Sequence, residues 1–81
     1  MRNIDEILAE MCAEIPHKTE KEESALYVIA CLLALYEFQE GFFSVDALYV
    51  LQHSLKDVPA AVKFIPAPLF VEMEMNCEQL V

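Results

Sequence analysis

The stretch SALYVIACLLALYEF, residues 24–38, decides the fold of this 81-residue chain. Twelve consecutive residues within it, 25–36, carry neither a charge nor a side-chain amide. On a helical wheel their apolar side chains cover the full circle, and a helix that is apolar all round is typical of a buried element. We therefore expect a central, fully buried helix over residues 19–40.

The ends of this predicted helix carry capping residues. In the sequence TEKE, Thr19 and Glu22 have the spacing of a capping box, in which each side chain accepts a hydrogen bond from the other residue's backbone N–H. Gly41 readily adopts the left-handed conformation that ends a helix. These signals place the helix between Thr19 and Glu40.

An amphipathic helix is predicted on each side of the central one. Residues 3–15 begin with a capping residue, Asn3, and are followed by Pro16, which cannot continue a helix. The stretch SVDALYVLQHSLKDV begins with Ser44 and is followed by Pro59. Apolar side chains recur at helical spacing in both: Ile4, Leu8, Met11, Cys12 and Ile15 in the first, and Leu48, Leu51, Leu55 and Val58 in the second.

The C-terminal segment leaves two alternatives open. A short helical piece is expected after Pro59, and the sequence PAP at 66–68 predicts an extended break. Residues 71–78 alternate apolar and polar as a strand does, whereas their composition favours a helix, so residues 69–80 are either helix or a lone strand. A lone strand would have to pair with another chain. The fold class is all-α: a small bundle of three to four helices in a single domain, 1–81.

The apolar content exceeds what so short a chain needs for its own interior. Hydrophobic residues make up 57% of the sequence, against about 45–50% in an average globular protein. A chain of this size buries only about 60% of the surface that its unfolded form exposes. Obligate protein interfaces are nearly as apolar as the interior of a domain. We therefore expect a second protein surface to cover part of the central helix, in a homo-oligomer or a heteromeric complex.

Seven aromatic and leucine side chains are the candidate partner-binding residues. They are Tyr27, Leu32, Leu35 and Tyr36 on the central helix, Phe42 and Phe43 in the turn after it, and Tyr49 on the third helix. Large aromatic side chains anchor many interfaces. For the Phe42–Phe43 pair, folding back into the core as a plug is favoured over docking to a partner. The expected function is that of a small, non-enzymatic adaptor, co-chaperone or inhibitor.

The charge of the chain suggests an alternative function. Fourteen acidic and five basic residues give a net charge of −9, which disfavours direct nucleic-acid binding. A candidate acidic face contains Glu6, Glu10, Glu14, Glu20, Glu22 and Glu23. Such a face either keeps an apolar protein in solution or mimics a nucleic acid in the basic groove of another protein. A mimic would lose its partner as salt is added, whereas a hydrophobic assembly would not.

No pattern in the sequence indicates catalysis, a cofactor or a metal. One glycine cannot form a phosphate-binding loop, and neither a Cys-x-x-Cys nor a His-x-x-x-His pair is present. His17 and His53 lie on different elements. Three cysteines, an odd number at wide spacing, are expected to be reduced.

The sequence predicts a protein that neither enters a membrane nor is exported. The apolar run is much shorter than the roughly 20 residues of a membrane-spanning helix. The N-terminal stretch MRNIDEILAEMC has acids where a secretory signal needs an apolar core. We expect a cytoplasmic protein.

The helical pair from Ala30 to Pro59, joined around EGFF, resembles a tetratricopeptide-type hairpin. Ala47, Leu51 and Pro59 fall where the second helix of that repeat has a small residue, a large apolar residue and a terminal proline. Ser54 replaces the second alanine, and no large aromatic stands near the start of the first helix. The resemblance implies a helix hairpin, and one such hairpin cannot bury its own apolar face.

Overall fold

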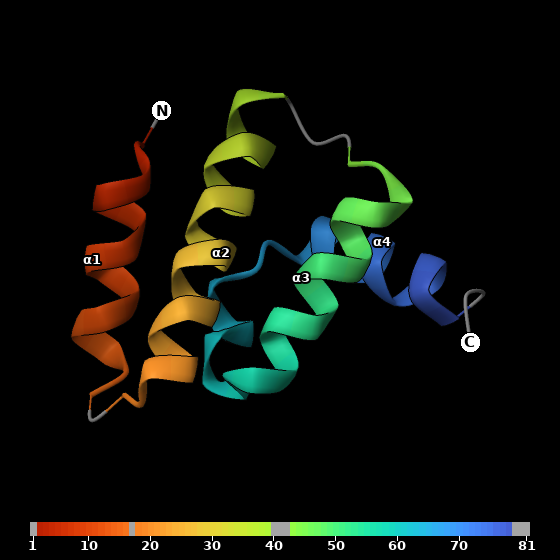
Figure 1. Ribbon diagram of the computed structural model, residues 1–81. Helices are drawn as coiled ribbons and strands as arrows, with labels where there is room; N and C mark the ends of the chain where they lie inside the picture. The colour runs from red at the N-terminus through yellow and green to blue at the C-terminus, as the bar shows by residue number, and fades with distance from the viewer. Residues whose placement is uncertain (1, 17, 40–42, 79–81) are drawn as a thin grey trace.

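The computed structural model describes residues 2–16, 18–39 and 43–78, and this part of the chain is helical without strands (Figure 1). The elements are, in order, α1 (Ile4–Glu14), α2 (Glu20–Phe38), α3 (Val45–Asp57), the 3-10 helix η1 (Pro59–Phe64) and α4 (Ala67–Glu78). The predicted all-α class is thus confirmed.

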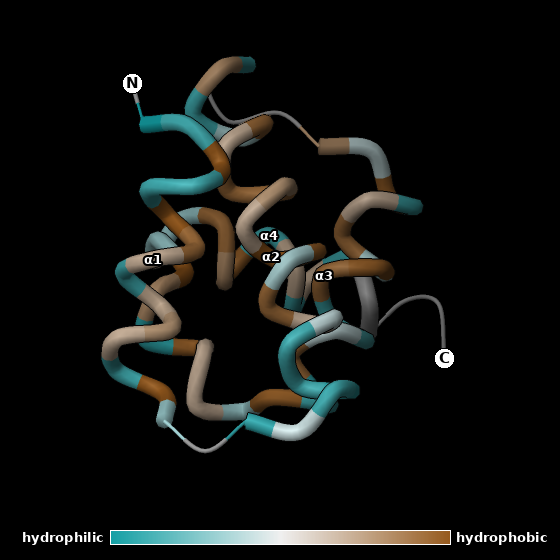
Figure 2. Tube along the Cα trace, turned by 60° about the vertical axis from the view of Figure 1, so that its left-hand side comes forward, coloured by the Kyte–Doolittle hydropathy of each residue, from teal (hydrophilic) through white to brown (hydrophobic). Residues whose placement is uncertain are grey.

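The helices are arranged in chain order. α1 packs along α2, α2 along α3, and α3 contacts both η1 and α4 (Figures 1 and 2). The radius of gyration of 12.0 Å is that of a compact domain of this length, for which about 12 Å is expected. The molecule measures 34 × 28 × 17 Å and is therefore flattened.

The three predicted N-caps are all present. Asn3 and Ser44 each accept a hydrogen bond from the backbone N–H three residues further on, at 2.9 and 3.2 Å. Thr19 accepts from the N–H of Glu22 at 3.2 Å, and the Glu22 carboxylate accepts from the N–H of Thr19 at 3.0 Å. The sequence therefore specifies where α1, α2 and α3 begin.

The C-terminal ends are formed differently. After α1, the Lys18 ammonium donates to the carbonyl oxygen of Ile15 at 2.7 Å, so a basic side chain from the following turn satisfies the end of a helix that has no base in its own last turn. α2 ends at Phe38, with Gln39 as its C-cap. The predicted end at Glu40 and Gly41 lies outside the described residues.

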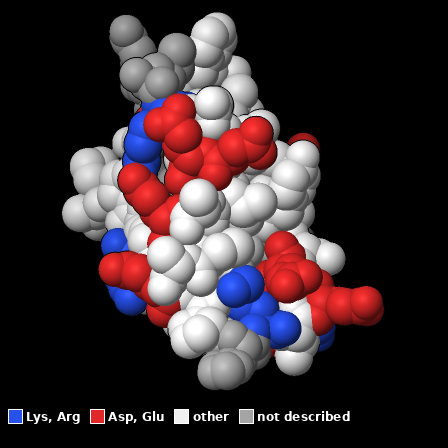
Figure 3. Space-filling view, turned by 90° about the vertical axis from the view of Figure 1, so that its left-hand side faces the viewer, with Lys and Arg blue, Asp and Glu red and all other residues white. Residues whose placement is uncertain are grey.

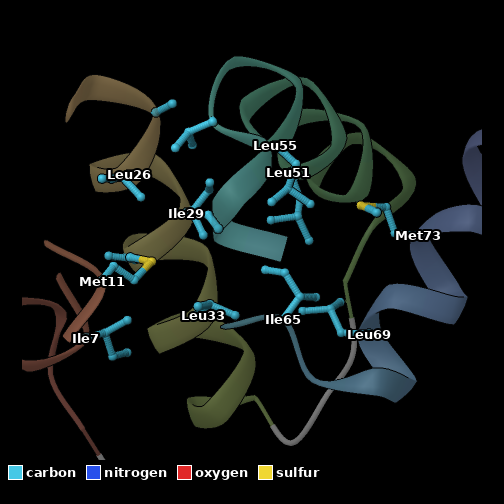
Figure 4. Packing of buried hydrophobic residues seen from close by; sticks show 14 of the residues in the cluster. Ile7, Met11, Leu26, Ile29, Leu33, Leu51, Leu55, Ile65, Leu69 and Met73 are labelled. Atoms are coloured by element: carbon cyan, nitrogen blue, oxygen red, sulfur yellow. The ribbon is translucent and has the colours of Figure 1, made fainter. Parts of the chain in front are cut away.

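One continuous core runs through all the elements (Figure 4). Its fully buried large side chains are Ile7 and Met11 of α1, Leu26 and Ile29 of α2, Leu48 and Leu51 of α3, Val58, and Leu69 of α4. In Figure 4, Leu33, Ile65 and Leu69 lie together, so the segment that enters α4 reaches the C-terminal half of α2.

The prediction that the central helix is buried on every side is wrong for the single chain. One side of α2 is buried, through Ala25, Leu26, Ile29, Ala30 and Leu33. On the opposite side Tyr27 is 53% exposed, Leu35 40% and Phe38 70%. The physical reason is the flat arrangement: α1 and α3 each cover one flank of α2, and α4 packs against α3, which leaves the third side open.

The segment after Pro59 forms η1 and then α4. Ile65 is extended between them, and α4 has Pro68 in its first turn, where a missing N–H costs nothing. Of the two alternatives for residues 69–80, the structure has the helical one through Glu78. Residues 79–81 lie outside the described part of the chain.

Candidate functional site

An uninterrupted apolar strip lies on the open side of α2. It consists of Tyr27, Val28, Cys31, Leu35 and Phe38, all of which are exposed or partly exposed, and we call it the α2 strip. At about 100° per residue, these positions fall within an arc of about 100° on the helix. Ser24, which is exposed, continues the same arc toward the N-terminal end of α2.

A shallow hollow borders the C-terminal half of this strip. It has a volume of about 460 Å³ and is lined by Arg2, Asn3 and Ile4 from the start of α1 and by Cys31, Ala34, Leu35 and Phe38 from α2. The hollow is open at Ala34 because the side chain of alanine is only a methyl group. The surface therefore combines a protruding aromatic, Phe38, with a neighbouring depression.

The one charged residue within 24–38, Glu37, forms an ion pair with Arg2, which precedes α1. The Arg2 guanidinium donates to the Glu37 carboxylate at 3.0 Å and also to Glu10. The hydrogen bond from Arg2 holds the pKa of Glu37 below its ordinary value, and the same bond to Glu37 raises the pKa of Arg2. The α2 strip thus contains no charge, and the Glu37 carboxylate beside it is paired.

The predicted partner-binding residues divide into two groups. Tyr27 and Leu35 belong to the α2 strip. Leu32 and Tyr36 are only partly exposed and pack against the core from the flank of α2. The Tyr36 ring meets Phe43 edge to face, with ring centroids 5.7 Å apart.

The aromatics outside α2 do not extend the strip. Phe43 packs against the core cluster, which is the arrangement of a plug, and Phe42 lies outside the described residues. Tyr49 is 45% exposed on α3, with its ring against His53 at a centroid distance of 4.3 Å.

Sequence reasoning missed Phe38, Cys31 and the contribution of Arg2 and Ile4. Phe38 was reachable from the sequence, because Tyr27, Cys31, Leu35 and Phe38 stand at i, i+4, i+8 and i+11, one helical face. Which side of α2 is covered by α1 depends on tertiary packing, and no local sequence pattern predicts it.

The predicted acidic face is interrupted by bases. Figure 3 shows the face on the α1 side, where Lys and Arg lie beside several of the acidic groups. Glu10 pairs with Arg2, and Glu14 pairs with Lys63 at 3.1 Å. Glu22 is engaged in the capping box, where hydrogen bonds from Thr19, first from its backbone N–H, lower its pKa. Exposed and outside the described ion pairs are Glu6, Glu20 and Glu23.

A second hollow lies between α3, η1 and α4. It has a volume of about 520 Å³ and is lined by Gln52, Leu55, Lys56, Pro59, Val62, Phe70, Met73 and Glu74. Leu55 and Met73 are core residues, and Lys56 and Glu74 place charges of both signs beside them. Five of its eight lining residues are apolar, so it is an apolar depression with charged side chains at its edge.

Among the side chains that the structure describes, in 2–16, 18–39 and 43–76, no three His, Cys, Asp or Glu residues come together as metal ligands would. None of the described helices has the length and apolar character needed to cross a bilayer.

In comparisons with protein families, curated proteins and solved structures, no match to this chain was found.

Proposed function

We propose that this protein is a small, non-enzymatic protein-binding protein, an adaptor, co-chaperone or inhibitor, and that the α2 strip is its contact surface. It acts in a homodimer or a heteromeric complex in the cytoplasm. One observation carries the proposal: Tyr27, Leu35 and Phe38 expose 40–70% of their surface on one uncharged helical face.

Exposure of this kind is costly for a protein that stays alone. Single exposed apolar residues are normal on any surface, whereas a contiguous apolar patch marks an interaction site or an aggregation risk. The two aromatics of the α2 strip supply large contact area with few rotatable bonds, as interface anchors do. The adjoining hollow adds a site into which a partner side chain fits.

The acidic-mimic alternative has weaker support. A mimic needs unpaired carboxylates in a regular array, and two members of the predicted array, Glu10 and Glu14, are held by Arg2 and Lys63. The binding mode is therefore expected to be hydrophobic, with affinity that holds or rises as salt is added.

A photo-crosslinking amino acid at position 38 tests the proposal in cells that naturally express the chain. The matched control carries the same crosslinker in place of Val71, which is 53% exposed on α4. We expect defined covalent adducts, with this chain or with another protein, from position 38 and not from position 71. Adding Leu35→Asp to the position-38 variant should remove them, while circular dichroism shows that the helices are retained.

Equal yields at the two positions would contradict the proposal, because adducts would then reflect exposure alone. Absence of adducts at position 38 would contradict it as well.

A further inference from the structure

We propose that the partner of the α2 strip is an amphipathic helix of a different protein, apolar along one side and with Lys or Arg at the end that lies over the first turn of α2. This assignment rests on the proposed function, since it names the occupant of the same surface. The face of α2 that carries the strip is apolar at one end and acidic at the other, and this division specifies the chemistry of the occupant.

The face that carries the α2 strip becomes acidic toward the N-terminal end of the helix. Glu20, Ser24 and Tyr27 stand at i, i+4 and i+7, so they lie on one helical face. Glu23, four residues before Tyr27, lies beside them, and both glutamates are exposed. About three apolar turns, 27–38, are therefore followed on the same face by one acidic turn, 20–23.

The described bases of the chain do not pair with Glu20 or Glu23. Three of the five Lys and Arg side chains form ion pairs with other carboxylates: Arg2 with Glu10 and Glu37, Lys21 with Asp57, and Lys63 with Glu14. Lys18 donates to the end of α1, and Lys56 lines the hollow between α3, η1 and α4. A partner that covers this end of the face therefore has to supply the positive charge, because a carboxylate that loses its water without gaining a partner is costly.

A second copy of this chain does not match the division. Two α2 helices packed parallel would bring Glu20 of one copy near Glu20 of the other, and like charges repel. Packed antiparallel, Glu20 would approach the end near Phe38, where the neighbouring base, Arg2, is already paired. The net charge of −9 on each copy adds repulsion over longer distances. The occupant is therefore a different protein, with the opposite charge at this end.

The shape of the strip fits a helix. An extended peptide generally binds by adding a strand to the edge of a sheet, and the described part of this chain contains no strand. A helix instead docks through apolar side chains at i, i+3 or i+4, and i+7, which match a straight strip about 18 Å long. The hollow beside Leu35 and Phe38, about 460 Å³ in volume, has room for one of these side chains.

The acidic turn selects between partners more than it adds affinity. Charged groups at the rim of an interface steer association and reject partners of the wrong charge, and they add little to net affinity. The apolar strip supplies most of the affinity, which is retained at high salt. The property specific to Glu20 and Glu23 is thus a preference for basic over acidic partner ends, and salt screens that preference.

The first experiment selects partners by charge. The probe is a displayed library of amphipathic helices of about 18 residues, long enough to span residues 20–38 at about 1.5 Å per residue. Each peptide has a Leu–Ala stripe, and Lys, Glu or Ser varies at the outer positions of both ends. The 81-residue chain is the bait, and its Leu35→Asp variant removes peptides that bind outside the strip. We expect the selected peptides to carry Lys at one end and to show no charge preference at the other.

The second experiment locates the charge preference on α2. A selected peptide carrying a fluorophore is titrated by fluorescence anisotropy. Glu20→Gln combined with Glu23→Gln should weaken its binding about fivefold at low salt, and less than about twofold at 1 M salt, where the Debye length is about 3 Å. The control combines Asp46→Asn with Glu74→Gln, which removes the same charge from exposed positions on α3 and α4. It should leave the affinity unchanged, while circular dichroism shows that both variants retain their helices.

Three results would overturn this assignment: no peptide that depends on Leu35, Leu35-dependent peptides without a preference for Lys, or an equal loss of affinity in the control variant. Adducts of position 38 with another protein in cells would in each case leave the proposed function standing. Adducts of position 38 with this chain alone would also overturn the assignment and would still support the proposed function. If position 38 gives no adducts, both proposals fail.

Discussion

α2 and α3 have similar places in the molecule but very different outer faces. α2 packs between α1 and α3, and α3 packs between α2 and α4 with η1 as a further neighbour. The outer side of α3 carries charged and polar residues, among them Asp46, His53, Lys56 and Asp57, between its exposed Val45, Tyr49 and Val50. The outer side of α2 carries an unbroken apolar strip from Tyr27 to Phe38.

The helix with more neighbours therefore has the more polar surface. Were apolar content set only by packing within the chain, α3 would be the more apolar helix of the two. Packing within the described chain does not account for the apolar α2 strip, and this observation is what motivates the proposed partner contact.

The largest expected effect separates the two sides of α2. Leu26→Ala, at a fully buried position, should lower the free energy of unfolding by about 2–5 kcal/mol. Phe38→Ala, at a 70% exposed position, should change it by less than about 0.5 kcal/mol in dilute protein. Urea unfolding followed by circular dichroism measures both. Similar losses for the two variants would mean that the strip supports the monomer fold, and the comparison with α3 would no longer hold.

A smaller effect is expected at the N-caps, where α2 and α3 are alike. Thr19→Ala and Ser44→Ala should each cost about 1 kcal/mol, a fall in Tm of about 4–8 °C for a chain of this length. Thr19→Ala should cost more than Ser44→Ala, because it also releases Glu22 from the capping box. Thr19→Ser keeps the hydroxyl and serves as the control. A cost at Ser44 larger than that at Thr19 would show that the reciprocal bond adds nothing.

The smallest effect depends on pH and concerns the link between α1 and α2. Because Arg2 lowers the pKa of Glu37 in the folded state, the ionised carboxylate stabilises the fold above its ordinary pKa of about 4.3. That contribution is lost as pH falls through the lower, folded-state pKa, while Arg2 stays charged. Glu37→Gln should therefore be slightly less stable than the unmodified chain at pH 7 and equally stable in strong acid. A difference that persists unchanged in acid would exclude the charge of Glu37 as its source.

Local signals in the sequence predict where the helices lie. Asn3, Thr19 and Ser44 act within a single turn, so their roles are readable from spacing alone, and the apolar faces of α1 and α3 are equally local. The prediction failed at the surroundings of α2. Whether a side chain such as Tyr27 or Phe38 is covered depends on where α4 packs, and α4 packs on α3 through contacts between residues far apart in the chain.

The candidate site, like the fold, was predictable only where local sequence patterns determine it. Tyr27 and Leu35 were identified because they lie on the apolar helix, whereas Leu32 and Tyr36, named for the same reason, pack against the core. Separating the two pairs requires knowing which flanks α1 and α3 occupy. The ion pairs of Glu10 and Glu14 bring in Arg2 and Lys63, and no spacing rule connects Glu14 with a lysine on η1.

The packing of each helix mainly against the next along the chain also affects how the molecule folds and opens. Chains dominated by local contacts fold within about microseconds to milliseconds. α1 has one principal helical neighbour, but its Ile7 and Met11 are fully buried in the core, so its detachment from α2 would expose core residues and should be rare. Its detachment would uncover Ala34 and widen the α2 strip along one edge. The partly exposed Arg2–Glu37 ion pair adds little to this attachment, because ion pairs at the surface contribute little to stability.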